Sequence, residues 1–250
     1  MLDTDDRVRV EVGPKRVRTY FDGELLADTL RPRLVWEIPY YPAYYIPAAD
    51  VRMDRLSPTD TRRRSPSRGE AHCFTVRGGD RVAEDAAWHY PESPVEALRG
   101  LVRFDWEAMD AWFEEDDRVY THPRSPYARV DILSGSRPVE VLLNGVTVAE
   151  TQRPTVLFET GLPPRYYMPL VDVRMDLLRP SSKVTHCPYK GTATYWSVDV
   201  GGALFPDLVW TYRTTLPESV RIAGLVAFLN EKVDLVVGGE PQERPRTPFS

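Results

Sequence analysis

The chain has 250 residues, a length that fits two domains of about 110 residues each. Its apolar content of 42% is typical of a globular protein, and it contains no run of about 18 apolar residues, which excludes a membrane-spanning helix. The net charge is −5: residues 1–124 carry 19 basic and 24 acidic side chains (−5), and residues 125–250 carry 13 of each (zero). Neither half is basic enough to predict a nucleic-acid surface.

The first residues and the cysteines indicate the compartment. The acidic start, Met1–Asp6, has no apolar core, so we expect no signal peptide. Cys73 and Cys187 are the two cysteines, and they do not occupy equivalent positions of the repeat described next. We therefore expect no disulfide and a cytoplasmic protein.

The chain contains a long internal repeat. Residues 17–76 align with residues 139–198 without a gap at an offset of 122, and 22 of the 60 positions are identical. A repeat of this length indicates two copies of one domain rather than a solenoid of small units.

Each copy is predicted to begin with a β-hairpin. Residues 17–21 and 24–29 flank Asp22-Gly23, and residues 139–143 and 146–151 flank Asn144-Gly145. Both turn pairs favour two-residue hairpins. Short strands follow at 34–37 and 156–159 and then at the Tyr-Tyr segments. The Pro-rich stretches 39–47 and 163–169 are expected to stay out of central strands, because proline cannot donate to a ladder.

The rest of each copy is also β-rich. Further strands are predicted at 70–76, 82–90, 192–200 and 207–212, short helical stretches at 95–99 and 218–222, and closing segments at 101–104 and 225–228. The second closing segment aligns at an offset of 124, which indicates a two-residue insertion near Pro217. The predicted fold is mainly β, with two tandem domains of antiparallel sheets that each carry one short helix. The predicted ranges are a first domain at 1–116, a linker at 117–136, a second domain at 137–240 and a disordered tail at 241–250.

Both copies hold the same charged and aromatic residues at equivalent positions. In the first copy these are Arg31, Glu37, Tyr44, Tyr45, Arg52, Asp54, Trp88 and Tyr90. In the second copy they are Arg153, Glu159, Tyr166, Tyr167, Arg174, Asp176, Trp210 and Tyr212. The Arg-x-Asp pair on a strand predicts either a salt bridge that supports the sheet or a guanidinium that clamps an anionic ligand. The aromatic residues either fill a small β core or line a pocket.

The copies differ in one reactive cluster. Residues 185–191 read Thr-His-Cys-Pro-Tyr-Lys-Gly, where residues 63–69 read Arg-Arg-Ser-Pro-Ser-Arg-Gly. A thiol at Cys187 near the ammonium of Lys190 suggests a nucleophile, with His186 or His122 moving protons. The alternative is a structural turn in which the cysteine acts as a small hydrophobic residue and the lysine is solvated.

Metal and cofactor chemistry is not predicted. The chain has no Cys-x-x-Cys pair, and its four histidines are scattered. Gly78-Gly79 and Gly201-Gly202 are expected to form hairpin turns rather than phosphate-binding loops. Asp172 and Asp176 would share a face if both lay on one strand, and only that spacing favours metal-dependent nucleotidyl transfer.

Several long motifs carry a family resemblance. They are Arg-Pro-x-Leu-Val-Trp-Glu, Tyr-Tyr-x-Pro-x-x-Asp-Val-Arg-Met-Asp, Thr-His-Cys-Pro-Tyr-Lys-Gly-Thr-Ala-x-Tyr-Trp-Ser-Val and the later Trp-x-Tyr. With them the chain resembles, over roughly residues 8–240, a tandem pair of the bacterial domain of unknown function 427, which is also labelled nucleotidyltransferase-like. The resemblance implies a β-tent fold, in which two antiparallel sheets meet at an angle, as in the cereblon ligand-binding domain. The zinc of many β-tent proteins is not implied, because its Cys-x-x-Cys motifs are absent.

Three classes of function follow. The leading hypothesis is a cytoplasmic module that binds a small anionic or nucleotide-like molecule in the second repeat, with Tyr166, Tyr167, Arg174, Trp210 and Lys190 lining the pocket. The first alternative is a transferase or hydrolase that uses Cys187. The second is a structural or partner-binding protein. Neither nucleic acid nor a membrane is an expected partner, and the sequence leaves the oligomeric state open.

Overall fold

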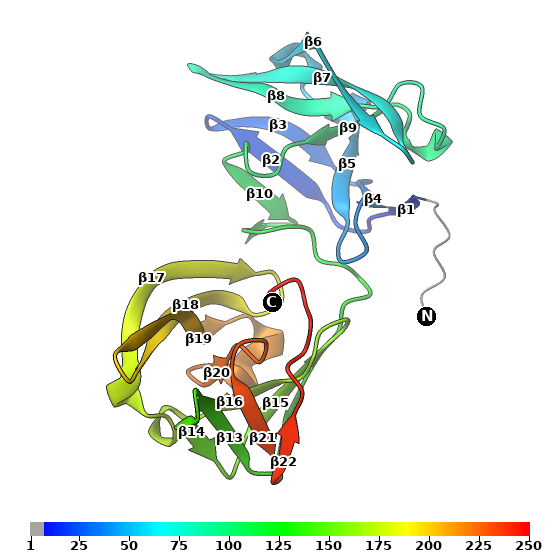
Figure 1. Cartoon of the computed structure of the whole chain (residues 1–250). Helices are drawn as coiled ribbons and strands as arrows, with labels where there is room; N and C mark the ends of the chain where they lie inside the picture. The colour runs from blue at the N-terminus through cyan, green and yellow to red at the C-terminus, as the bar shows by residue number, and fades with distance from the viewer. Residues whose placement is uncertain (1–7) are drawn as a thin grey trace. The chain divides into compact units, whose positions relative to one another are not determined.

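The computed structural model describes residues 8–250 and divides into two compact units, Met1–Ser125 and Pro126–Ser250 (Figure 1). Each unit is mainly β, as predicted, and contains one seven-stranded and one four-stranded antiparallel sheet. None of the helices in the described part of the chain has the length and hydropathy of a membrane-spanning segment.

In the first unit, the seven-stranded sheet has the order β1-β4-β5-β9-β8-β7-β6 and the four-stranded sheet the order β11-β10-β2-β3. The strands of the larger sheet are, in that order, Arg9–Val12, Arg33–Trp36, Ala43–Pro47, Leu101–Phe104, Arg81–His89, Gly69–Gly78 and Leu56–Ser65. Those of the smaller sheet are Asp117–Val119, Ala111–Glu114, Val17–Phe21 and Glu24–Thr29. Three turns of 3-10 helix are η1 (Ala48–Asp50), η2 (Met53–Arg55) and η3 (Glu96–Leu98).

The second unit repeats this strand order. Its larger sheet runs β12-β15-β16-β20-β19-β18-β17 and its smaller sheet β14-β13-β21-β22. The larger sheet comprises Val130–Ser134, Thr155–Glu159, Arg165–Met168, Val226–Phe228, Ala203–Thr215, Gly191–Val200 and Leu178–Cys187. The smaller sheet comprises Val146–Thr151, Val139–Leu143, Asp234–Val237 and Glu240–Gln242. The 3-10 turns are η4 (Leu170–Asp172), η5 (Met175–Leu177) and η6 (Pro217–Ile222).

Both predicted hairpins are present with the predicted bounds, β2–β3 and β13–β14. Their turn residues have left-handed backbone angles: φ is 50° at Asp22 and 75° at Gly23, and 52° at Asn144 and 76° at Gly145. Asp, Asn and Gly tolerate this region best, which explains why these turns could be recognised from sequence.

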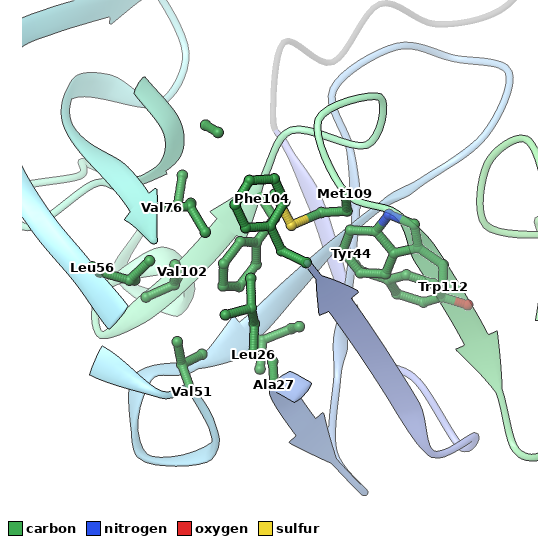
Figure 2. Packing of buried hydrophobic residues seen from close by; sticks show 14 of the residues in the cluster. Leu26, Ala27, Tyr44, Val51, Leu56, Val76, Val102, Phe104, Met109 and Trp112 are labelled. Atoms are coloured by element: carbon green, nitrogen blue, oxygen red, sulfur yellow. The ribbon is translucent and has the colours of Figure 1, made fainter. Parts of the chain in front are cut away.

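The main core of each unit lies between its two sheets. In the first unit Tyr44 from β5, Phe104 from β9 and Trp112 from β10 converge there with Met109 (Figure 2). The alternation of a strand sends Tyr45, the neighbour of Tyr44, to the opposite face of the seven-stranded sheet. We call this opposite face, which does not pack on the four-stranded sheet, the outer face.

The prediction for the Pro-rich stretches is wrong. Strand β5 lies between β4 and β9, and β16 lies between β15 and β20, so both are interior strands. The prolines do not interrupt the ladder hydrogen bonds, because Pro47 is the last residue of β5 and Pro169 follows β16. The Tyr-Tyr segments supply the N–H groups that the ladder needs.

The structure adds detail to three other predictions. The helical stretches at 95–99 and 218–222 are 3-10 turns, η3 and η6, and η1, η2, η4 and η5 are additional. The predicted linker, 117–136, contains β11, which pairs with β10, and β12, which pairs with β15. In the range predicted as a disordered tail, Arg244 donates to Asp234 at 2.9 Å and Thr247 donates to Glu231 at 2.5 Å.

A bulge on the third long strand of each unit is held by a carboxylate. Asp85 in β8 and Asp207 in β19 are equivalent, and both have left-handed backbones, with φ of 52° and 56°. Asp85 accepts hydrogen bonds from the Thr59 and Thr61 hydroxyls at 2.6 and 2.7 Å, and these bonds lower the pKa of Asp85. The β6–β7 and β7–β8 ladders both shift register near these residues, as expected at a β-bulge.

We expect Asp85→Ala to lower the free energy of unfolding by about 2 kcal/mol, because it removes two hydrogen bonds and puts alanine in the left-handed region, which aspartate tolerates better. Urea denaturation measures the change. Asp60→Ala, on an exposed residue nearby, is the control and should stay within about 0.5 kcal/mol of the wild type. Equal effects of the two substitutions would show that the bulge does not depend on the Asp85 carboxylate.

Candidate functional site

The outer face of each larger sheet gathers half of the shared residues. In the first unit Tyr45, Trp88 and Tyr90 form one buried cluster there. In the second unit Tyr167, Trp210 and Tyr212 form the equivalent cluster. Because they are buried, these aromatic residues contribute to the core of each unit. Charged side chains cover the part of each cluster that the sheet does not bury.

Glu37, which directly follows β4, organises the charges in the first unit. The Tyr45 hydroxyl donates to Glu37 Oε1 at 2.6 Å, and burial raises the pKa of Tyr45, which keeps this hydroxyl protonated. Arg103 Nη2 lies 2.9 Å from Glu37 Oε2, and Arg68 Nε lies 3.7 Å from Oε1. The side chains of Arg103, Arg68 and Glu37 are 18–19% exposed, so these ion pairs are at the rim of the core.

Guanidinium groups also pack on the aromatic rings. The Cζ atoms of Arg63 and Arg103 lie 4.3 and 4.4 Å from the centre of the Trp88 ring. Arg68 lies 5.8 Å from the ring of Tyr90 and donates to its hydroxyl at 3.3 Å. These distances are within the range of cation–π attraction. Arg63 is further anchored by a bond of 2.9 Å to the carbonyl oxygen of the bulge residue Asp85.

The cluster in the first unit has more cations than anions. Arg63, Arg68 and Arg103 surround Trp88 and Tyr90. Glu37 pairs with Arg68 and Arg103, and the Asp85 carboxylate attracts Arg63, so the three cations meet two carboxylates. Arg103 Nε is buried and has no hydrogen-bond partner among the described residues. The three guanidinium groups therefore carry one more positive charge than the Glu37 and Asp85 carboxylates neutralise.

The second unit uses a single lysine at the equivalent carboxylate. Lys190 Nζ donates to Glu159 Oε2 at 2.5 Å, and the two side chains are 11% and 13% exposed. Trp210 Nε1 donates to the Tyr167 hydroxyl at 3.1 Å, and burial raises the pKa of Tyr167.

A buried arginine lies beside the same tryptophan. Arg165 on β16 lies 5.8 Å from the Trp210 ring and makes a bidentate ion pair with Glu231 at 2.6 and 2.7 Å. The Glu231 side chain is fully buried and the Arg165 side chain is 8% exposed. Lys190 and Arg165 are thus each matched by a separate carboxylate.

The two clusters differ by particular replacements. Arg68 corresponds to Lys190, so a cation bound to the shared carboxylate is common to both units. Arg63 corresponds to Thr185, which bonds to the Tyr195 hydroxyl at 2.8 Å. Arg103 corresponds to Ala227, because both pair in register with the tryptophan. Arg165 in turn corresponds to Ala43. The arginine beside the tryptophan is therefore on β9 in the first unit and on β16 in the second.

The residues predicted as catalytic have different environments within their own units. Cys187 is half-buried and packs at the edge of the second cluster, directly across the hairpin from Gly191. Lys190 is engaged by Glu159. His186 is exposed, and its Nδ1 lies 3.0 Å from Thr192 Oγ1. His122 belongs to the first unit, where it stacks on Tyr41 at 3.7 Å.

The remaining predicted ligand residues lie elsewhere. Arg52 bonds twice to Asp54 at 2.8 and 2.9 Å, and Arg174 bonds twice to Asp176 at 2.7 and 2.9 Å. The salt-bridge interpretation therefore describes these pairs, but they are exposed and lie at η2 and η5 rather than on strands. Arg31 and Arg153 are exposed residues after β3 and β14.

Asp172 and Asp176 do not lie on one strand, and the first tyrosine of each Tyr-Tyr pair lies apart from the outer-face cluster. Asp172 is in η4 and Asp176 in η5, so the expectation of a shared strand face is wrong; Asp172 instead accepts from the Thr151 hydroxyl at 2.7 Å. Tyr44 is in the main core, where its hydroxyl donates to Glu114 at 2.6 Å. Tyr166, its counterpart, is half-buried. No group of three or more His, Cys, Asp and Glu side chains with metal-binding geometry occurs within residues 8–250.

Sequence reasoning missed most of the cations. Arg68 had a usable signal, since it aligns with Lys190. Arg103 and Arg165 had none, because each aligns with an alanine in the other copy. Arg63 and Glu231 likewise became visible only when the strands were placed side by side.

The comparisons with known proteins agree with the repeat. The model of the family described as "Domain of unknown function (DUF427)" matches residues 9–115 and 131–239. The chain therefore belongs to this family and contains two copies of its domain. A search of curated proteins finds no match.

The Lys190–Glu159 pair provides a direct test of the second cluster. We expect Glu159→Gln to lower the free energy of unfolding by about 3 kcal/mol, because the substitution leaves a mostly buried ammonium without its carboxylate. The double substitution Glu159→Gln with Lys190→Met should cost clearly less than the single one, as measured by chemical denaturation. Additive effects of the two substitutions would contradict a coupled pair.

The Arg165–Glu231 pair predicts a pH dependence. Burial opposes ionisation of Glu231, but bonds from Arg165 and Thr247 outweigh it and lower its pKa. The resulting stabilisation should be fully present above the ordinary glutamate pKa of about 4.3 and lost as the pH falls through the lower folded-state value. Urea denaturation at a series of pH values should show that the stability difference between wild type and Glu231→Gln shrinks as the pH falls below the ordinary glutamate pKa. A difference that stays constant with pH would contradict the assignment.

Proposed function

We propose that the chain is a tandem binding module and that its first unit binds the anionic group of a small molecule on the outer face. The surplus of guanidinium groups around Trp88 supports this proposal: Arg68 and Arg103 share the Glu37 carboxylate, and Arg63 lies beside Asp85, so three cations meet two carboxylates. Guanidinium groups recognise phosphate and carboxylate by charge and by paired hydrogen bonds.

Charge rather than base stacking is the proposed basis of recognition. The Trp88 ring is 7% exposed and already packs against two guanidinium groups. A nucleotide would therefore bind through its phosphate groups, and a phosphorylated or carboxylated metabolite without a base would bind equally well.

The proposal moves the ligand from the second repeat to the first. In the second unit Lys190 is paired with Glu159 and Arg165 with Glu231, so that cluster has no surplus charge to offer. Nucleophilic chemistry at Cys187 has less support than binding, since the neighbouring ammonium is bonded to a carboxylate. The two free cysteines fit the proposed cytoplasmic location.

Isothermal calorimetry with pyrophosphate tests the proposal. We expect binding to the wild type that weakens as salt is added, because the contacts are charged and partly exposed. Arg63→Gln should weaken binding by about tenfold, the loss expected for one charge-assisted hydrogen bond.

Arg64→Gln is the matched control. Arg64 is the next residue on β6, its side chain is 87% exposed, and it pairs with Glu70. Equal weakening by the two variants would leave only a diffuse charge effect and contradict a site around Trp88. Binding of ATP without binding of adenosine would support phosphate recognition, and the reverse would contradict it.

A further inference from the structure

The second unit contains a pocket that shares only Tyr166 with the ligand-binding residues predicted from sequence. Its volume is about 130 Å³, and its walls include Tyr166 from β16, Asn230, Leu235 from β21, and Gln242, Glu243 and Pro245 from the C-terminal segment. That segment is held in place because Arg244 bonds to Asp234 and Thr247 bonds to the buried Glu231.

The repeat explains why the pocket exists. In the first unit Trp106 stacks on Trp112 at 4.7 Å, and Trp112 lies 6.1 Å from Tyr44. The equivalents of these three residues line the pocket. Asn230 follows Phe228 as Trp106 follows Phe104, and Leu235 pairs with β13 as Trp112 pairs with β2. The second unit has thus replaced two indole rings by smaller side chains, and open space remains.

The replacement also releases the tyrosine hydroxyl. Tyr44 donates to Glu114, but the residue of β21 that takes the position of Glu114 is Val237. Tyr166 has no hydrogen bond within the described part of the chain. An unfilled cavity lowers the stability of the fold. Because this space also has polar atoms without a partner among the described residues, we interpret it as a ligand site rather than as a packing defect.

The polar lining consists mainly of acceptors. Asn230 uses its amide nitrogen on the carbonyl of Pro164 at 2.8 Å, and Gln242 uses its own on the carbonyl of Glu240 at 2.9 Å, so each amide oxygen remains available. Glu243 adds a carboxylate, and no lysine or arginine is among the lining residues in the described chain. Proline rings and the Tyr166 ring supply the apolar walls.

We propose that this pocket binds a small organic cation: an amine or amidine carried on a flat ring. Apolar cavities of about 150 Å³ hold a benzene ring, so the space suits one ring. The ring lies against the prolines and Tyr166, and the charged N–H groups donate to Glu243 and to the amide oxygens. This site is separate from the anion site proposed for the first unit and has the opposite charge preference.

Titration of the full chain with benzamidine, followed by ¹H–¹⁵N NMR, tests the proposal. We expect the side-chain amide of Asn230 to shift with a dissociation constant on the order of 1 mM, a reasonable value for so small a ligand. Benzoate, which has the same ring and the opposite charge, should leave that signal unchanged. Equal binding of the two compounds, or no shift at Asn230, would overturn the proposal.

Two substitutions separate charge from space. Glu243→Gln should weaken benzamidine binding about fivefold or more, whereas Glu240→Gln, on an exposed residue of β22 outside the lining, should leave it unchanged. Leu235→Trp returns an indole ring to the position of Trp112 and should abolish binding. Because the Glu243 and Glu240 variants change exposed residues, they decide the question even if the tryptophan variant does not fold. Full binding by Glu243→Gln would overturn the proposed role of charge.

Discussion

A seven-stranded sheet that has only one sheet as a packing partner must cover its second face in another way. In both units the main core fills one face, and aromatic residues on the outer face are covered by long cationic side chains that pair with carboxylates, among them Glu37 and Glu159. An ion pair at the rim of an aromatic cluster lets a long side chain cover apolar area while its charge is satisfied. The shared Glu, Tyr-Tyr and Trp-x-Tyr residues follow from this requirement.

The two copies satisfy the requirement with different charge balances. The first copy uses three arginines and two carboxylates, Glu37 and Asp85, and the second pairs Lys190 and Arg165 with separate carboxylates. The movement of an arginine from β9 to β16 keeps a guanidinium beside the tryptophan while pairing it with Glu231. The loss of two tryptophans opens space around Tyr166. Duplication has therefore preserved the scaffold and allowed each unit to develop its own surface.

Local signals in the sequence were sufficient for part of the fold. The hairpins could be predicted because Asp-Gly and Asn-Gly fit left-handed turns, and the tandem arrangement could be predicted from the repeat. The interior position of the Tyr-Tyr strands could not be predicted, because it depends on where the prolines lie relative to the ladder hydrogen bonds. Arg52 and Asp54 were predicted as a pair but on a strand, since their spacing is also compatible with a 3-10 turn.

The site was predicted less completely than the fold. Comparison of the copies identified Glu37, Trp88 and Tyr90, which both units need for packing. The same comparison singled out Cys187 and Lys190, because the copies differ there. Lys190 nevertheless pairs with Glu159 as Arg68 pairs with Glu37. Residues such as Arg103, whose counterpart is alanine, give no signal in such a comparison, because contacts across strands distant in sequence create their environment.

The proposed function depends most on the excess positive charge around Trp88. A crystal structure of the protein grown with pyrophosphate tests it most directly. The account predicts an anion in contact with Arg63 and with Arg68 or Arg103, and none at Lys190. Pyrophosphate at Lys190, or a first-unit cluster unchanged and empty at saturating pyrophosphate, would contradict it.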